Sequence, residues 1–224
     1  MSRQTRGQRR RTIRSLILDR NFEGLFTLNA SYPDTATYVV AFVFDRDDLT
    51  RWRAIEALGR LSAHLAQIGD LEKVRGIIRR ILWLMNDESG GIAWNGPEAI
   101  GEILYDVPVL LEEYGRIVAS FIDQEPFGPG THWAIARMTE RATSEFEDSL
   151  GELERSLESE LAEERGHALM SLSKIDPELG AKASETLLED SGELHLYDFE
   201  TGNLEKTTVG DIAREIRDRG TRAA

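Results

Sequence analysis

The sequence predicts an all-α protein, a right-handed superhelix of paired helices that ends in a small β-hairpin and one more helix. Three observations lead to this prediction. Apolar residues recur at helical spacing along most of the chain, a short motif returns after 42 residues, and apolar and polar residues alternate at 194–199. We expect a flexible basic N-terminus at 1–12, a helical array at 13–190 and a hairpin-and-helix cap at 191–219.

Composition and length limit the classes of protein to which the chain can belong. With 224 residues, of which 41% are hydrophobic, the chain is long enough to bury a core. It contains no cysteine, which excludes disulfides, thiolate nucleophiles and zinc–thiolate sites. No apolar run approaches the roughly 20 residues that span a bilayer, and the stretch at 13–18 is too short for the core of a signal peptide. We therefore expect a cytoplasmic protein with no membrane partner.

The net charge of −13 is distributed unevenly along the chain. Residues 1–20 contain seven arginines and one aspartate, whereas the remaining residues carry a net charge of −19. An acidic body repels phosphate backbones, so a nucleic-acid partner is not expected. The arginine-rich start is either an arm that touches an anionic surface or a solvated terminus, and the sequence favours the solvated terminus.

The first part of the chain has the pattern of successive helices. Apolar residues at 13–26 keep helical spacing with one break, which predicts one or two short helices. Pro33 and Asp34 open the next helix. Its apolar body at 38–44 would also suit a strand, but we prefer a helix because a lone strand would lack a partner. Apolar spacings of three and four residues predict two longer helices, at 49–67 and 71–85.

A glycine pair at 90–91 then interrupts the helical pattern, and Asn95 restarts it. We expect Asn95 to cap the new helix while Glu98 reaches back to it in a capping box. Pro97 fits the first turn, where its missing N–H leaves no acceptor unpaired. This helix is predicted to continue to residue 105.

The second part of the chain also reads as helices until its character changes near residue 190. The predicted helices cover 108–122, 131–142, 146–157, 159–175 and 177–188. The alternation at 194–199, a turn at 201–203 and a return at 204–208 together predict a β-hairpin. Thr208 is positioned to cap a last helix that begins at Val209.

A repeated motif supports the array. Residues 52–61 and 94–103 share the pattern Trp-x3-Glu-Ala-(Leu/Ile)-Gly-x-(Leu/Ile). Two looser copies bring four alanines into equivalence at spacings of 42, 35 and 34 residues, namely Ala57, Ala99, Ala134 and Ala168. Such periods are typical of helix-pair repeats, and small residues in the motif predict close approach of the packed helices.

These residues resemble HEAT repeats. The stretch 51–61 is similar to the second helix of the HEAT-like repeats in phycobilin-lyase-type proteins, and 86–104 resembles a bacterial HEAT-like family of anaerobic sulfate reducers whose function is not characterised. The resemblance covers about 34–176 and implies a HEAT-like α-solenoid. It implies no single activity, because such repeats occur in scaffolds, lyases and glycosylases. The third and fourth copies depart from the Glu-Ala-aliphatic-Gly core.

The first candidate site is the group Trp94, Asn95, Glu98 and Glu102. The two glutamates lie four residues apart on one helix face, after an acidic pair at 87–88. Clustered carboxylates bind Mg²⁺ or Ca²⁺, hold a cationic partner segment, or act as an acid/base pair. The sequence favours a plainer interpretation, in which Glu98 caps, Glu102 is solvated and Trp94 packs against the preceding repeat.

A second group lies one repeat earlier, where Arg53, Glu56 and Arg60 share a helix face. Ion pairs between repeats are the favoured interpretation of this face, and they contribute little to stability when exposed. His132, in the third copy of the motif, extends the surface, and no histidine belongs to a metal-binding motif. The four tryptophans are expected to pack in the core or between repeats rather than to line a ligand groove.

The function that the sequence favours is a non-enzymatic scaffold that binds a protein partner of basic or mixed charge through its second-helix layer. The proposed contact residues are Arg53, Glu56, Trp94, Asn95, Glu98, Glu102 and His132. No catalytic residue, metal or cofactor is assigned, and the oligomeric state is left open.

The alternative is a HEAT-like enzyme or enzyme accessory, either a prosthetic-group lyase or chaperone or a DNA base-excision glycosylase. A glycosylase requires a positive groove that contains a tryptophan and a buried carboxylate. A groove of mixed or negative charge favours the scaffold instead.

Overall fold

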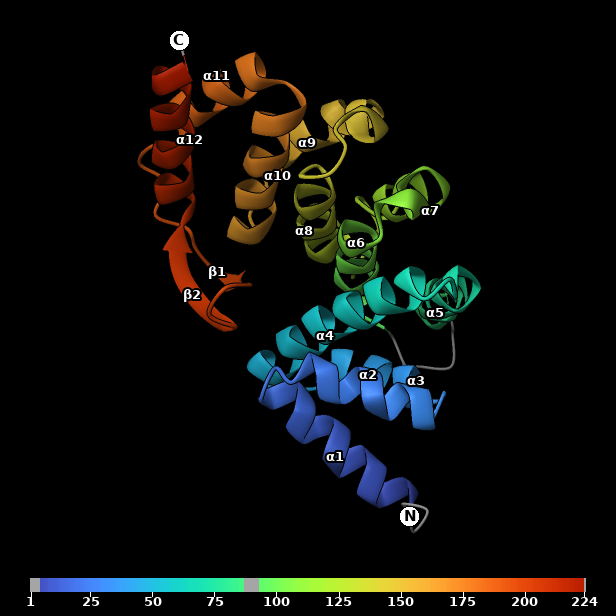
Figure 1. The fold of residues 1–224 in the computed structure, drawn as a ribbon. Helices are drawn as coiled ribbons and strands as arrows, with labels where there is room; N and C mark the ends of the chain where they lie inside the picture. Colours follow the sequence, from blue (N-terminus) through green and yellow to red (C-terminus); the bar gives the residue numbers. More distant parts are fainter. Residues whose placement is uncertain (1–4, 87–92, 224) are drawn as a thin grey trace. The chain divides into compact units, whose positions relative to one another are not determined.

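The structure is a computed structural model that describes residues 5–86 and 93–223. The chain divides into two compact units, Met1–Val107 and Pro108–Ala224, and each is described by itself. Figure 1 shows the helices of both units and the β-hairpin near the C-terminus. The described residues therefore match the predicted class, which is almost entirely helical with one small antiparallel sheet.

The first unit consists of helices in the order that the apolar spacing predicts. They are α1 (Arg6–Leu18), α2 (Phe22–Ser31), α3 (Thr35–Val43), α4 (Asp48–Gln67), α5 (Leu71–Met85) and α6 (Gly96–Asp106). The apolar segment that would also suit a strand is helical in α3, where Val39, Val40 and Val43 are buried. Within the described ranges the two strands of the hairpin pair with each other. A strand at 38–44 would therefore lack a partner strand, and the segment buries its apolar side chains as a helix instead.

The first helix begins earlier than the sequence analysis expects. Residues 6–12, predicted to be flexible, belong to α1, whose first turn is closed by a capping box between Thr5 and Gln8. The buried side chains of Ile13 and Ile17 hold this helix to the unit. Residues 1–4 lie outside the described residues. The predicted boundary is wrong because five arginines in the helix conceal its apolar stripe.

Helices α4 and α6 carry the two close copies of the motif and lie side by side in the first unit. Ala57 and Ala99 are fully buried, as the motif predicts. A Cβ atom added at Gly59 would come within 2.8 Å of Glu102 Cγ and 2.9 Å of Asp106 Oδ2 on α6. The glycine is therefore required by the close approach of the two helices.

The start of α6 differs from the predicted capping box. Asn95 occupies the N-cap, but its side chain accepts no backbone hydrogen bond. Its Nδ2 atom instead donates to Glu98 Oε1 at 2.9 Å, a bond between side chains. Pro97 lies in the first turn, as predicted. The predicted glycine-pair break at 90–91 and the acidic pair at 87–88 lie outside the described residues.

The second unit contains shorter helices, two 3₁₀ turns and the hairpin. Its elements are η1 (Pro108–Leu110), α7 (Leu111–Ala119), α8 (Gly128–Met138), η2 (Ser144–Ser149), α9 (Leu150–Ser156), α10 (Ala162–Ile175), α11 (Pro177–Leu187), β1 (Glu193–Asp198), β2 (Asn203–Thr208) and α12 (Val209–Ala223). Helix α8 begins three residues before the predicted position, because Pro129 suits a first turn rather than a loop. The helix predicted at 108–122 ends at Ala119.

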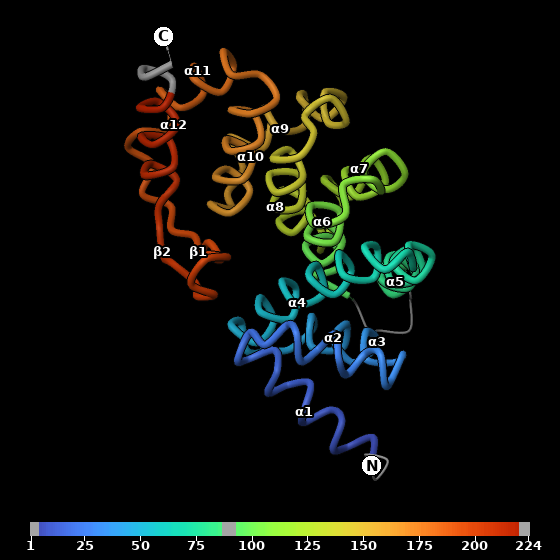
Figure 2. Tube along the Cα trace, in the orientation of Figure 1, coloured from blue at the N-terminus to red at the C-terminus, as the bar shows by residue number. Residues whose placement is uncertain are grey.

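The hairpin and the last helix form as predicted and pack on the helices before them. Strands β1 and β2 are antiparallel, with Leu194 opposite Thr207. At the start of α12, the Thr208 hydroxyl accepts from Asp211 N at 3.1 Å, and the Asp211 carboxylate accepts from Thr208 N at 3.2 Å. A shared core joins this cap to α10 and α11, and its buried members are Leu169, Ala183, Leu194, Val209, Ile212 and Ala213. Figure 2 traces the hairpin and α12 along α10.

Candidate functional site

The predicted site residues of the first unit include three glutamates that are buried. Glu56 and Glu102 have no exposed surface, and Glu98 is 7% exposed. Glu56 accepts two hydrogen bonds from Arg20, at 2.7 and 2.9 Å. Arg60 makes the ion pair between repeats, at 3.5 Å from Asp106. The glutamates therefore stabilise the packed helices and present no carboxylate to a macromolecular partner.

The other predicted residues of this unit differ in accessibility. Arg53 donates to the backbone carbonyl of Leu18 and so connects α4 to the end of α1. Trp94 is 59% exposed and Trp83 is 64% exposed, contrary to the packing role expected for both. Trp52 and Trp94 occupy the same motif position but differ in burial, because Trp52 is half-buried and Trp94 is exposed. The shared position therefore does not predict a shared packing role. Asn95 is half-buried, and its side-chain amide is hydrogen-bonded to the Glu98 carboxylate.

His132, the predicted residue of the second unit, connects two helices. Its side chain is buried, with Nδ1 2.7 Å from the Gly128 carbonyl and Nε2 2.7 Å from the Ser156 hydroxyl. Burial lowers the pKa of His132. Nδ1 donates to the Gly128 carbonyl, which can only accept, and Nε2 shares a hydrogen bond with the Ser156 hydroxyl, which also lies 2.8 Å from the Glu152 carbonyl. This pair of bonds ties α8 to α9 and leaves no ring nitrogen for a partner.

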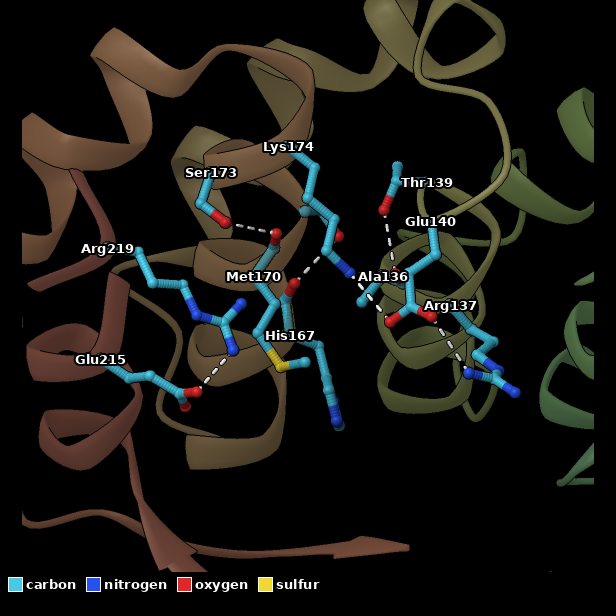
Figure 3. Close-up of polar contacts among 11 residues, drawn as sticks. Ala136, Arg137, Thr139, Glu140, His167, Met170, Ser173, Lys174, Glu215 and Arg219 are labelled. Atoms are coloured by element: carbon cyan, nitrogen blue, oxygen red, sulfur yellow. Dashed lines mark hydrogen bonds and ion pairs between the residues drawn. The ribbon is translucent and has the colours of Figure 1, made fainter. Parts of the chain in front are cut away.

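The second unit contains a groove that the sequence analysis did not predict. Its volume is about 430 Å³, and helices α10 and α12, strand β1 and Glu140 in the turn after α8 supply its walls. Its lining residues are Glu140, Met170, Ser173, Lys174, Leu196, Ile212, Glu215, Ile216 and Arg219. Figure 3 shows Met170 between the Glu215–Arg219 pair of α12 on one side and Arg137 and Glu140 on the other.

One hydrogen-bonded ion pair joins two walls of this groove, and another lies within α12. Lys174 of α10 donates to Glu140 Oε1 at 3.1 Å and to the Ala136 carbonyl at 3.2 Å. Arg137 donates to the other oxygen of Glu140 at 3.1 Å, and Arg219 pairs with Glu215 at 2.6 Å. Two cations, Lys174 and Arg219, and two carboxylates, Glu140 and Glu215, therefore line the groove around an apolar floor. The groove is of mixed charge.

A smaller pocket of about 130 Å³ adjoins the groove and shares Glu140, Met170 and Leu196 with it. Aromatic residues supply most of its remaining wall. The rings of Tyr197 and Phe199 meet edge to face with their centroids 4.9 Å apart, and Trp133 lies 6.4 Å from Phe199. The guanidinium of Arg137 stacks 4.0 Å above the Phe199 ring, a cation–π arrangement.

His167 also lines the small pocket. It is 5% exposed, and neither ring nitrogen makes a hydrogen bond of normal geometry, although the Glu163 carbonyl is near enough to affect its pKa. Burial, and secondly the neighbouring His132, lower the pKa of His167 to about 3. At neutral pH its ring is therefore uncharged, and both of its nitrogens are shielded from solvent.

A second hollow, of about 450 Å³, lies in the first unit between α3 and α5. Its walls are apolar at Ala36, Val40 and Ile77, and its charged residues lie toward the surface. Gly76 leaves part of it open, because a Cβ added there would have no atom within 4 Å. The charged side chains Lys73 and Asp70 pair with each other at its edge. The buried Asn29 and the exposed Arg80 also line the hollow, so it combines apolar walls with polar groups.

Among residues 5–86 and 93–223, no group of three or more potential ligand side chains is placed to hold a metal ion. None of the helices in these ranges is long and apolar enough to cross a bilayer.

Comparison with known proteins addresses the fold. No family model matches the chain. Over 85 residues, 38% of this chain, the sequence is 31% identical to an uncharacterized protein of Archaeoglobus fulgidus, and the match spans 43% of that protein. A designed armadillo repeat protein superposes with a TM-score of 0.55 at 16% identity, over 97% of this chain and 95% of the other. The fold is that of the armadillo and HEAT-like repeats.

An archaeal HEAT-like repeats protein from Thermococcus onnurineus NA1 is also similar, with a TM-score of 0.41 at 13% identity over 97% of each chain. Within the repeat fold, Ala57, Ala99, Ala134 and Ala168 occupy α4, α6, α8 and α10, and all four are fully buried. Burial of these alanines agrees with their expected role as packing positions, while the equivalence of the four motif copies stays a prediction. The comparisons do not address a phycobilin lyase, so that part of the resemblance stays a prediction.

The groove is not predictable from local patterns because three distant segments build it. Arg137 and Glu140 are three residues apart, and Trp133 precedes Arg137 by four, a helical spacing visible in the sequence. That spacing gives one wall only. The other wall comes from α12 and the aromatic end from β1 and Phe199, which no local pattern relates to α8.

Proposed function

We propose that this protein is a non-enzymatic helical-repeat scaffold that binds a short segment of a partner protein in the groove between α10, α12 and the turn after α8. The observation that carries the proposal is the groove itself, an apolar floor between two charged walls. A binding surface with an apolar centre and a polar rim is the usual arrangement at protein interfaces. The armadillo and HEAT-like fold is suited to such use, because its stacked helices form extended surfaces.

The apolar floor is suited to bind the side chains of a partner segment that enters the groove. Met170, Leu196 and Ile216 are each half-buried, so their remaining apolar surface becomes covered when a segment enters. Methionine is flexible and adapts to partners of different shape. These three residues are therefore proposed to supply most of the binding energy.

The charges of the groove support a partner of mixed charge. From Pro108 to Ala224 the chain has 12 basic and 26 acidic residues, whereas the groove is lined by Lys174 and Arg219 and by two glutamates, with Arg137 in the adjoining pocket. A carboxylate of the segment would lie near these cations, and basic residues beside it would face the acidic surroundings. Among the contact residues that the sequence predicted in the first unit, Trp94 has an exposed ring. We therefore retain it as a residue that contacts the partner.

The enzyme alternatives receive less support. The glycosylase requires a positive groove with a buried carboxylate, whereas Glu140 and Glu215 are exposed and the walls are of mixed charge. No observation favours a prosthetic-group lyase over a scaffold.

Selection of peptides from a random display library against the full chain tests the proposal. We expect enriched peptides with micromolar affinity, and we expect Lys174→Glu/Arg219→Glu to weaken them at least tenfold. The matched control is Lys182→Glu/Lys206→Glu, which makes the same change in net charge outside the groove. Trp94→Ala reports on the exposed tryptophan separately. A library that yields no enriched peptide, or equal loss in both double variants, would contradict the proposal.

A further inference from the structure

The hollow between α3 and α5 in the first unit has the size of a small-molecule site. Its volume is about 450 Å³, within the range of roughly 300–1,000 Å³ that ligand pockets occupy. Residues of α5 at spacings of three and four line one side, and apolar residues of α3 and α4 line much of the rest. Val40, Leu65 and Ile77 are the largest apolar side chains of these walls, so an apolar body of a ligand would be covered there.

Asn29 adds a polar group to the hollow without a partner in the protein. It lies on α2 and is only 8% exposed. Its side-chain amide makes no hydrogen bond with any residue that the structure describes. In contrast to the nitrogens of His167, the amide atoms are not shielded completely, so a molecule in the hollow can reach them. An amide both donates and accepts, and a ligand amide or hydroxyl would pair with it.

Arg80 provides the free positive charge of the hollow. It is exposed, and within residues 5–86 and 93–223 it has no ion pair or hydrogen bond. The other charged side chains of the lining are paired, Lys73 with Asp70 and Glu72 with Arg79. A carboxylate of a ligand would therefore bind to Arg80, whose guanidinium suits a carboxylate in geometry as well as in charge.

We infer that this hollow binds a small amphipathic carboxylic acid, with its apolar chain between α3 and α5, its carboxylate paired with Arg80 and an amide or hydroxyl group of the chain hydrogen-bonded to Asn29. Lys73 and Arg80 are seven residues apart on α5, about 10 Å along the helix axis, so an extended chain of medium length spans the site. An uncharged apolar molecule would leave both polar groups without a partner. The site belongs to the first unit and does not depend on the proposed peptide groove.

Three matched probes test the chemistry of the ligand. N-octanoylglycine has an apolar chain, an amide and a carboxylate. Undecanoate has a chain of the same length and the carboxylate but no amide, and N-octanoylglycinamide lacks the charge. Each is titrated into the full chain by calorimetry. We expect N-octanoylglycine to bind with micromolar affinity, and the glycinamide to bind at least about fivefold more weakly.

Two polar variants assign the contacts. Asn29→Leu, which keeps a side chain of similar size, should shift the affinity ratio of N-octanoylglycine to undecanoate by about fivefold in favour of undecanoate. Arg80→Glu should weaken both acids at least about fivefold. The matched control is Arg46→Glu, an exposed arginine of the same unit outside the hollow. An unchanged ratio in Asn29→Leu, or equal effects of the two arginine variants, would overturn the inference.

A third variant fills the hollow. A Cβ added at Gly76 has no atom within 4 Å, so Gly76→Phe can place its ring in the hollow without a clash. This variant should lose binding of all three probes and keep its helical circular dichroism spectrum. Gly151→Phe is the matched control in α9, where the nearest atom is an Arg155 nitrogen at 3.8 Å. Binding of N-octanoylglycine that survives Gly76→Phe, or that is absent from the unmodified chain, would contradict the inference.

The groove variant Lys174→Glu/Arg219→Glu separates this inference from the proposed function. It should lose the selected peptides and still bind N-octanoylglycine, whereas Gly76→Phe should show the reverse. Loss of N-octanoylglycine in the groove variant alone would place the probe in the groove and overturn the inference. Library peptides that compete with N-octanoylglycine and are lost in Gly76→Phe would mean that the hollow receives a polypeptide, which overturns the small-molecule assignment.

Discussion

Arg20 donates two hydrogen bonds to the buried carboxylate of Glu56, from a position 36 residues earlier in the chain. Arg20 lies between α1 and α2 with a φ of 50°, in the left-handed region that few non-glycine residues adopt. This backbone angle accompanies a turn that brings the guanidinium onto α4. The pair fixes the start of the chain against the helix that carries the first motif copy.

Replacement of Arg20 by methionine should destabilise the first unit by about 3 kcal/mol, because a buried carboxylate loses its cation. The double variant Arg20→Met/Glu56→Leu should recover much of this loss, since it removes both charges together. Urea denaturation followed by circular dichroism measures both. A single variant as stable as the unmodified protein would show that Glu56 does not depend on Arg20.

Two glycines of the first unit should respond in opposite directions to the same substitution. Gly59→Ala should cost about 1–3 kcal/mol, because the added Cβ lies 2.8 Å from Glu102 Cγ. Gly76→Ala, in α5 with open space around its Cβ position, should stabilise by up to about 1 kcal/mol through helix propensity. Thermal denaturation of the two variants side by side gives the comparison. A loss at both positions would mean that the close approach at Gly59 is not the cause.

Much of the fold can be predicted from the sequence because it depends on local patterns. The apolar stripe at 71–85 predicts that helix with its bounds, and the hairpin follows from strict alternation and a turn. The motif alanines are buried as expected. The prediction errs at two helix starts. Basic or proline-rich segments were expected to be loops, but α1 begins with a capping box at Thr5 and α8 begins with Pro129 in its first turn.

The candidate site is less predictable, for a physical reason. Glu56, Glu98 and Glu102 have the spacing of a surface face, and sequence alone treats a carboxylate as solvated. Their burial depends on partners that local spacing does not reveal, such as Arg20 for Glu56. The groove likewise depends on α12 lying against α10, which is a tertiary relationship.

The buried His167 predicts how the free energy of unfolding depends on pH in the acid range. The pKa of His167 is lowered from 6.5 to about 3 by burial, so below pH 6.5 the unfolded chain binds a proton that the folded chain does not. Stability should therefore fall as the pH decreases from about 6.5 to about 3. His167→Leu should weaken this dependence, whereas the exposed His195 replaced by leucine should not. Denaturation midpoints measured across this pH range test it, and identical slopes for the two variants would refute the assignment.

The junction between α11 and β1 is held by a bidentate ion pair that should prefer arginine to lysine. Arg165 donates to both oxygens of Asp190, at 2.7 and 2.9 Å, and both side chains are mostly buried. Asp190 also accepts from Gly192 N at 2.8 Å, so the carboxylate orders the chain that enters the hairpin.

Arg165→Lys keeps the charge but not the paired geometry, and should cost about 1–2 kcal/mol. The hydrogen bonds from Arg165 lower the pKa of Asp190, so the stabilisation is present above the ordinary carboxyl pKa of 3.8 and is lost as the pH falls below it. Guanidinium denaturation at neutral and acidic pH measures this. The difference between Arg165→Lys and the unmodified protein should shrink at low pH, and a difference that stays constant would mean that packing of the arginine, rather than the ion pair, holds the junction.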